Sequence, residues 1–139
     1  MMDDYLEAGG MIISRLRESL PDLRVSPSWS LAEIRETPDL APSLLVFLEG
    51  DTPGEGLPSG SSHKVEQRWT VVVIARDAEG EAGSMISRTI AALASWRPPG
   101  GRFSPLRRVA SSHTPDRTPA GVFYFPVAFA TGFVFNVCD

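Results

Sequence analysis

The sequence predicts an α+β fold, a two-layer sandwich in which two main helices cover one face of a mostly antiparallel sheet of about four to five strands. Two segments have the apolar period of an amphipathic helix, several others have the alternation or apolar runs of strands, and the elements do not alternate regularly between the two types. The 139 residues, 42% of them hydrophobic, are expected to form one domain over residues 1–139. At this length roughly 68–70% of the unfolded surface can be buried, so the fold requires neither a metal nor a disulfide.

Both helices are predicted from the spacing of their apolar residues. Over residues 3–20 these residues fall on one stripe, and Pro21 ends the helix. Over residues 81–96 they recur at helical spacing, and the Pro-Pro-Gly-Gly run at 98–101 ends the helix. These two segments are the main helices of the expected sandwich.

Four strands are predicted before the end of the chain. A short one covers residues 23–25, and a run of apolar residues at 43–48 is expected to be a central strand buried on both faces. Residues 65–74 alternate between apolar and polar at first and then become continuously apolar. A further strand over 102–110 is interrupted by Pro105.

The closing segment, residues 123–137, is a long strand with two different faces. Every second residue from Phe123 onward lies on one face, and most of these residues are aromatic. The opposite face begins with Tyr124 and continues with mostly small residues, including Pro126 and Ala128. A face of small residues lets another backbone, a helix or a second subunit approach closely. Pro126 lacks an N–H for the ladder, so we expect the strand to be at an edge, or bulged, at this position.

Two polar segments are predicted to be mobile loops. Residues 50–64 are rich in Gly, Pro and Ser, and residues 111–121 are polar and contain two prolines. Neither segment has enough apolar surface to offset the entropy of becoming ordered.

Composition excludes several classes of protein. The net charge of −4 argues against a domain that grips nucleic acid by neutralising phosphates. The lone Cys138 excludes an internal disulfide framework and a cysteine-rich zinc site. No stretch approaches the roughly 18–20 apolar residues that span a bilayer, and the first residues lack the basic lead of a signal peptide. We therefore expect a protein of a reducing cytoplasm with no membrane partner.

No motif for catalysis or cofactor binding is present in the sequence. Residues 80–84 lack the G-x-S-x-G pattern, and the glycine-rich residues 54–64 depart from a P-loop because the lysine comes too late and a strand follows. His63 and His113 lie fifty residues apart in polar segments with no obvious second ligand beside them. We predict no catalytic residue, no cofactor and no metal site.

Six residues are candidates for a protein interface. Trp29 stands in a segment of Ser and Pro, where it is either an exposed aromatic anchor or partly buried beneath the loop. The other candidates lie on the two long strands of the sheet: Glu66, Arg68, Tyr124, Pro126 and Ala128.

Four segments in order carry a family resemblance. They are residues 13–25 (ISRLRESLPDLRV), 42–48 (PSLLVFL), 67–76 (QRWTVVVIAR) and 90–100 (IAALASWRPPG), followed by the aromatic closing strand. The chain resembles the phage tail terminator (tail-completion) proteins of tailed phages and Mu-like prophages. The resemblance covers nearly the whole chain and consists of core residues and element order.

The resemblance implies a non-enzymatic assembly protein of the virion tail, made in the cytoplasm of the bacterial host. Members of the family assemble as a ring, usually a hexamer, on the end of the tail tube. There they stop tube polymerisation and present a surface for joining the head. The implied partners are further copies of the chain, the tail-tube protein and a head-completion or connector protein, with no sequence-specific nucleic acid. No contact residue carries over, because no motif for one is matched.

Two alternatives remain open at this point. One is another virion part of similar fold, a head–tail connector or neck protein. The other is a small α+β ligand-binding domain or enzyme with a pocket under residues 50–64, near His63, Glu66 and Arg68. Such a pocket would be concave and would gather polar groups whose pKa values are shifted.

Overall fold

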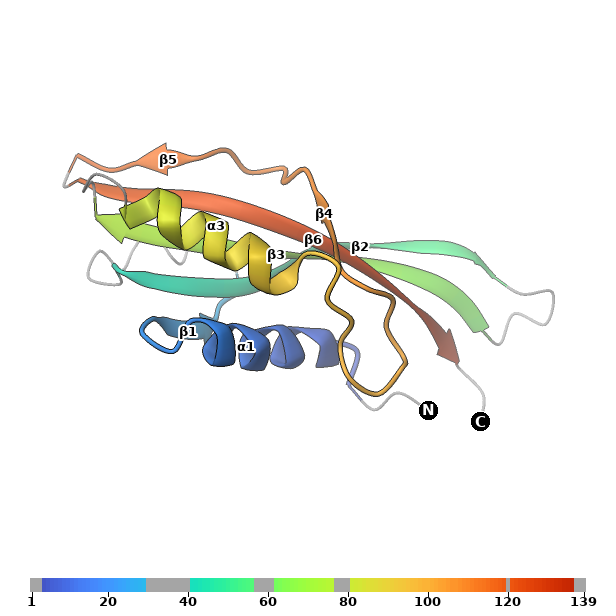
Figure 1. Ribbon diagram of the computed structural model, residues 1–139. Helices are drawn as coiled ribbons and strands as arrows, with labels where there is room; N and C mark the ends of the chain where they lie inside the picture. The colour runs from blue at the N-terminus through green and yellow to red at the C-terminus, as the bar shows by residue number, and fades with distance from the viewer. Residues whose placement is uncertain (1–3, 30–40, 57–61, 77–80, 120, 137–139) are drawn as a thin grey trace.

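The computed structural model describes residues 4–29, 41–56, 62–76, 81–119 and 121–136. Over these residues the chain forms two helices and one six-stranded sheet (Figure 1). The elements are α1 (Glu7–Ser19), β1 (Arg24–Pro27), β2 (Ser43–Gly56), β3 (Ser62–Arg76), α3 (Glu81–Leu93), β4 (Arg107–Val109), β5 (Asp116–Arg117) and β6 (Val122–Asn136).

The sheet confirms the predicted α+β class. Its strand order is β1-β2-β3-β6-β4, with β5 also beside β6, and every pair except β1–β2 is antiparallel. The strand predicted over residues 102–110 is the three-residue β4, which begins after Pro105, and the sixth strand is β5, which spans only two residues and was not predicted. Strands this short carry no alternation that a sequence pattern can reveal.

Both helices pack on one face of the sheet, which we call the helix face. The Nε of Arg15 in α1 donates to the carbonyl of Ala92 in α3 over 3.0 Å, and its guanidinium lies 5.6 Å from the ring centre of Trp96. Gly9 brings α1 close to the sheet, since a Cβ at this position would lie 2.5 Å from the ring of Trp69. The glycine that lowers helix propensity therefore allows close packing between the two layers.

The predicted loop over residues 50–64 is wrong at both ends. Residues 50–56 continue β2 and residues 62–64 begin β3, and the two strands pair as far as Gly56↔His63. Residues 57–61 lie outside the described part of the chain. Cross-strand hydrogen bonding satisfies the backbone here, so the segment forms strands in spite of its composition. The long strands extend beyond the two helices as an arm, on the right of Figure 1.

Strand β6 has the two faces that the sequence predicts. Val127, Phe129 and Phe133 join the core beneath the helices, whereas Tyr124 joins a smaller apolar cluster on the other face. The edge expected at Pro126 exists only locally, because β3 pairs with β6 along one side and β4 and β5 pair with parts of the other side. The pairing with β5 ends at Tyr124 and that with β4 begins at Ala128, so neither of these strands pairs with Pro126.

A strap, residues 107–117, runs from β4 to β5 and borders the second face of the sheet. Its two ends pair with β6, but its middle contacts β2, which lies two strands away. The middle of the strap therefore crosses the face opposite the helices. This segment includes most of the second loop predicted from composition, and part of it is fixed by the contacts described below.

Candidate assembly surface

Trp29 lies two residues after the end of β1, and its side chain is 80% exposed rather than partly buried. Beside it is a groove of ≈ 540 Å³ between α1 and the strands β1 and β2. Apolar side chains from both layers line the groove, among them Leu6, Ile13, Pro27, Val46 and Leu48. An exposed indole next to an apolar groove is the kind of surface on which proteins anchor a partner.

Glu66 and Arg68 lie on the second face of the sheet, away from this groove. Glu66 is ion-paired with Arg107 of the strap at 2.6 Å, and the two side chains are 47% and 57% exposed. The Nε of Arg68 lies 2.5 Å from a carboxylate oxygen of Glu49. Both candidates therefore contact other residues of the same chain and keep part of their surface in water.

Tyr124, Pro126 and Ala128 are buried within the chain. The structure brings these three residues to the same sheet face as Glu66 and Arg68, because the register of β3 against β6 places even-numbered residues opposite one another. It leaves them no open surface, however, because the chain itself covers this part of the face. Of the six candidates, only Trp29 is a large apolar side chain exposed to solvent.

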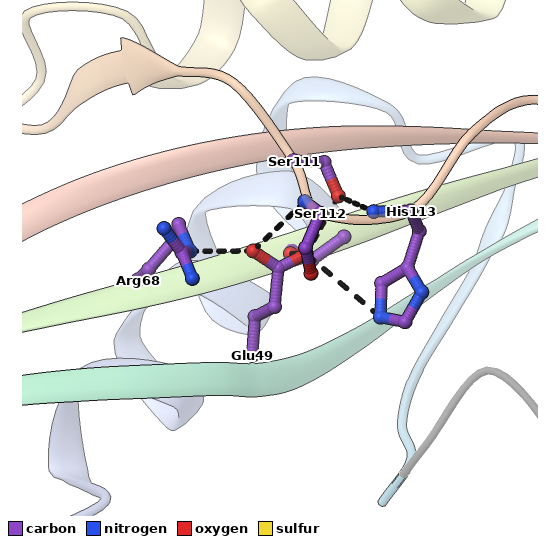
Figure 2. A network of polar contacts seen from close by, with 6 residues as sticks. Glu49, Arg68, Ser111, Ser112 and His113 are labelled. Carbon is purple, nitrogen blue, oxygen red and sulfur yellow. Dashed lines mark hydrogen bonds and ion pairs between the residues drawn. The ribbon is translucent and has the colours of Figure 1, made fainter.

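Glu49, which sequence reasoning missed, is the centre of a buried polar network on the second face (Figure 2). Leu48 pairs with Trp69 and Gly50 pairs with Arg68, so Glu49 is the additional residue of a β-bulge in β2. Its side chain is 2% exposed. Its carboxylate is ion-paired with Arg68 and accepts hydrogen bonds from three groups: Ser111 Oγ at 2.6 Å, Thr70 Oγ1 at 3.1 Å and Ser112 N–H at 3.4 Å.

The donors around Glu49 determine its protonation. Burial raises the pKa of the carboxyl group, but the hydrogen bonds from Ser111, Ser112 and Thr70 and the charge of Arg68 outweigh it, so that the pKa lies below its ordinary value. His113 Nε2 lies 3.9 Å from the same carboxylate, and its ring packs edge-on against Phe47 at 5.7 Å. Glu49 is thus an ionised group that holds the strap against the sheet.

A second, neutral network lies on the helix face around Gln67, whose side chain is fully buried. Gln67 Nε2 donates to the carbonyl of Tyr5 over 2.8 Å, and Trp69 Nε1 donates to Gln67 Oε1 over 3.0 Å. The Tyr5 hydroxyl donates to Asp51 over 2.7 Å. Burial and this hydrogen bond raise the pKa of Tyr5 to about 12. The network ties the segment before α1 to the sheet.

The structure offers little support for a ligand-binding pocket near residues 50–64. A cavity of ≈ 590 Å³ there is lined by Lys64, Glu66, Arg97 and Arg102, but not by His63 or Arg68. Arg102 is paired with Glu7 at 2.7 Å, and Glu66 with Arg107. Among the described residues, the groups whose pKa values are clearly shifted are elsewhere: Tyr5, Asp22, Glu49 and Arg88.

Two further kinds of site have no candidate among the described residues. Within the described residues, no group of three or more His, Cys, Asp and Glu side chains is placed to hold a metal ion. In the same part of the chain, neither helix is long and apolar enough to cross a membrane. His63 packs against Phe135 at 5.8 Å between ring centres, and His113 lies beside Glu49.

Comparisons with known proteins place the fold. A chain in a solved structure titled "Virion of native gene transfer agent (GTA) particle" is similar with a TM-score of 0.62 and 16% identity, over 95% of this chain and 100% of that one. No curated protein matches the sequence. The family model described as phage tail terminator protein matches residues 1–137. Because this match spans almost every residue and agrees with the resemblance of the core segments, the chain belongs to the phage tail terminator protein family.

Proposed function

We propose that this chain caps the end of the tail tube, stops its polymerisation and provides the surface to which the head is joined. Its family makes it a structural protein of the phage tail, located in the virion tail. The observation that supports a capping role is the Trp29 groove, an apolar surface that the described residues leave open. Synthesis in the cytoplasm of the bacterial host is part of the same proposal.

The proposed assembly is a ring of copies of this chain on the end of the tube. The family resemblance implies that the ring usually has six copies. A ring requires a heterologous contact, in which two different surfaces of the same chain meet. The sheet has two different edges, since β1 with Trp29 stands at one end of the strand order and β4 with the strap at the other. The proposed partners are further copies, the tail-tube protein and a head-completion or connector protein.

The test is a tube-assembly reaction with the cognate tail-tube protein, with and without this chain. Electron microscopy measures the lengths of the tubes and shows whether a ring sits on their ends. We expect shorter tubes with capped ends, and we expect Trp29→Ala to lengthen them again. Val134→Ala, at another exposed apolar side chain that lies on β6 in the arm, is the matched control and should cap like the wild type.

Two outcomes would contradict the proposal. A chain that neither associates nor alters tube length or tube ends is not a terminator. A chain that binds the head or its connector but ignores tubes is the alternative named above, a head–tail connector or neck protein. A ligand-binding domain or enzyme is the weaker alternative, because the cavity near residues 50–64 lacks the expected convergence of groups.

A further inference from the structure

The outer edge of β6 is unpaired at its end in the arm. Alternate residues of an antiparallel strand direct both their N–H and their C=O groups to the same side. Gly132 directs its groups outward, because its N–H donates to Ser104 Oγ over 2.8 Å and its carbonyl accepts from the Ser104 N–H over 2.9 Å. The pairing of β6 with β3 has no register shift, so Val134 and Asn136 also face outward. Within the described residues, nothing pairs with either of them on this side.

Other unpaired edges of the described sheet are blocked. On β1, the Val25 carbonyl accepts from the Arg17 guanidinium over 2.9 Å. A proline in an edge strand prevents a further strand from pairing there, because it has no N–H. Three prolines occupy such places: Pro27 on β1, Pro53 on β2 in the arm and Pro126 on β6 between its contacts with β5 and β4. Residues 133–136 of β6, which we call the open edge, contain no proline and keep the groups that a further strand needs.

The surroundings of the open edge are basic. A cavity of ≈ 590 Å³ lies beside it, and residues 132–134 form part of its lining. Three basic side chains and one acidic side chain line the same cavity: Lys64, Arg97, Arg102 and Glu66. Arg102 and Glu66 each form an ion pair within the chain. Lys64 and Arg97 have no ion pair in the described part of the chain. An excess of cations here, in a chain of net charge −4, favours an anionic partner.

The two cations without an ion pair lie on different sides of the sheet. Lys64 is directly opposite Val134 in the register of β3 and β6, on the second face. Arg97 also lines a groove along α1, on the helix face. Side chains of an added strand point alternately to the two faces. Acidic side chains on either face of such a strand therefore meet a cation.

We propose that the open edge of β6 binds an extended acidic segment of another protein, which adds to the sheet as a further strand. Backbone hydrogen bonds to Val134 and Asn136 set the register of the added strand. Lys64 and Arg97 select acidic side chains over neutral or basic ones. The open edge is a different surface from the Trp29 groove, so this binding does not rest on capping of the tail tube.

The first experiment measures amide hydrogen exchange in the free chain by NMR. The amides of Phe133 and Phe135 face β3, whereas those of Val134 and Asn136 face outward. We expect the two outward amides to exchange at least about tenfold faster than the two inward ones, because no strand protects them. A Val134 amide as protected as that of Phe133 means that the edge is not open, and the proposal fails.

The second experiment titrates the chain with a synthetic ten-residue peptide in which Thr alternates with Glu. The peptide should protect the amides of Val134 and Asn136 from exchange and leave those of α3 unchanged. A peptide with Lys in place of Glu should bind at least about tenfold more weakly, and added salt should reduce this difference. Absence of binding by the Glu peptide, or equal binding by the Lys peptide, overturns the proposal.

Val134→Pro tests the backbone contact. It removes the outward N–H and leaves the pairing with β3 intact, so the midpoint of urea unfolding should stay at the wild-type value. Affinity for the Glu peptide should fall about two- to tenfold, which corresponds to one hydrogen bond. A folded Val134→Pro variant that binds the Glu peptide like the wild type overturns strand addition.

The double variant Lys64→Glu with Arg97→Glu tests the charges and does not depend on how the proline variant folds. It should weaken binding of the Glu peptide by at least about tenfold. Arg76→Glu is the matched control, because it reverses an exposed charge at the other end of β3. We expect it to change the affinity by less than about twofold, since charges this far apart are screened. Equal losses in the double variant and in the control overturn the assigned site.

Two further outcomes assign the surface to a different partner and overturn the proposal. A DNA duplex that binds more tightly than the Glu peptide, with an affinity that Val134→Pro leaves unchanged, identifies a site for phosphates. Self-association of the wild type that Val134→Pro abolishes, measured by sedimentation, identifies a second copy of the chain as the occupant. These measurements contain no tail tubes, so failure of the capping proposal is seen separately.

Discussion

Glu49 and Gln67 are two buried polar side chains on opposite faces of one stretch of the sheet, and they secure their neighbours in different ways. Gln67, on the helix face, is neutral and holds the backbone of Tyr5. Glu49, on the second face, is charged and holds the strap through Ser111 and Ser112. Each joins a segment from outside the sheet to its long central strands.

The two side chains differ in how much free energy is lost when a hydrogen-bond partner is removed. An amide that loses one partner loses a neutral hydrogen bond, of about 0.5–1.5 kcal/mol net. A carboxylate out of water needs several donors at once, and hydrogen bonds to charged groups contribute about 1.5–3 kcal/mol. The Gln67 network is therefore a fixed structural tie, whereas the Glu49 network depends on the charge of one group and responds to pH.

Trp69→Ala should give the largest effect, because it removes a donor of the Gln67 network and a large part of the core beneath α1. We expect the free energy of unfolding to fall by about 3–5 kcal/mol. Urea denaturation followed by circular dichroism measures it. Trp29→Ala removes the same side chain from an 80% exposed position and should cost less than about 0.5 kcal/mol. Equal losses at the two tryptophans would contradict the described packing.

Glu49→Gln should give the next largest effect on stability. The shape of the side chain is kept, but hydrogen bonds to a charged acceptor become neutral ones and Arg68 loses its partner. We expect a loss of about 1–3 kcal/mol in the free energy of unfolding. Glu66→Gln, at the exposed pair with Arg107, should cost at most about 1 kcal/mol. A larger loss at Glu66 than at Glu49 would reverse the assignment of the main tie.

The pH dependence separates the charged network from the neutral one. The pKa of Glu49 is lower in the folded chain than its ordinary value, so its contribution to stability is present above about pH 4.3 and is lost as the pH falls through the folded pKa. The stability difference between wild type and Glu49→Gln should therefore shrink below about pH 4.3. Asp22, whose pKa is also lowered by Arg88, is present in both proteins and cancels. A difference that stays constant in acid would contradict an ionised Glu49.

The sequence predicted the parts of the fold that depend on regular periodicity. Both helices, the run at 43–48 and the two faces of β6 were recognisable because alternate or helical spacing of apolar residues reports burial directly. The structure moved their ends: α1 begins at Glu7, and α3 ends at Leu93 rather than Trp96. Helix ends depend on individual hydrogen bonds, which a periodic pattern does not contain.

The features that sequence reasoning missed depend on contacts between distant segments. Residues 50–56 form a strand because β3 pairs with them, in spite of their Gly and Pro content. In the sequence, Glu49 looks like a polar residue at the end of an apolar strand. Its burial and its hydrogen bond with the strap depend on the β-bulge opposite Trp69 and Arg68, which the sequence does not reveal. The burial of Tyr124 and Ala128 likewise requires the rest of the chain to cover their face.

Tyr5→Phe should give the smallest effect among the changes within the two polar networks, and it tests the neutral network alone. The phenylalanine keeps the edge-on packing against Phe133 and Phe135, and the backbone carbonyl of residue 5 still accepts from Gln67. The hydrogen bond to Asp51, which lies near the surface, is lost, so we expect a cost of about 0.5 kcal/mol at neutral pH.

The pH at which Tyr5 titrates distinguishes its network from that of Glu49, because the pKa of Tyr5 is raised whereas that of Glu49 is lowered. The pKa of Tyr5 is raised from about 10 in the unfolded chain to about 12 in the folded one, so its contribution to stability is complete below pH 10 and is lost as the pH rises through 12. Subtracting the phenolate absorbance of Tyr5→Phe from that of the wild type isolates this group from Tyr124. A midpoint near pH 10 in the folded protein would show that the hydroxyl is neither buried nor held by Asp51. A midpoint near 12 with a stability loss above about 2 kcal/mol in Tyr5→Phe would mean that the neutral tie depends on the hydroxyl rather than on the Gln67 amide.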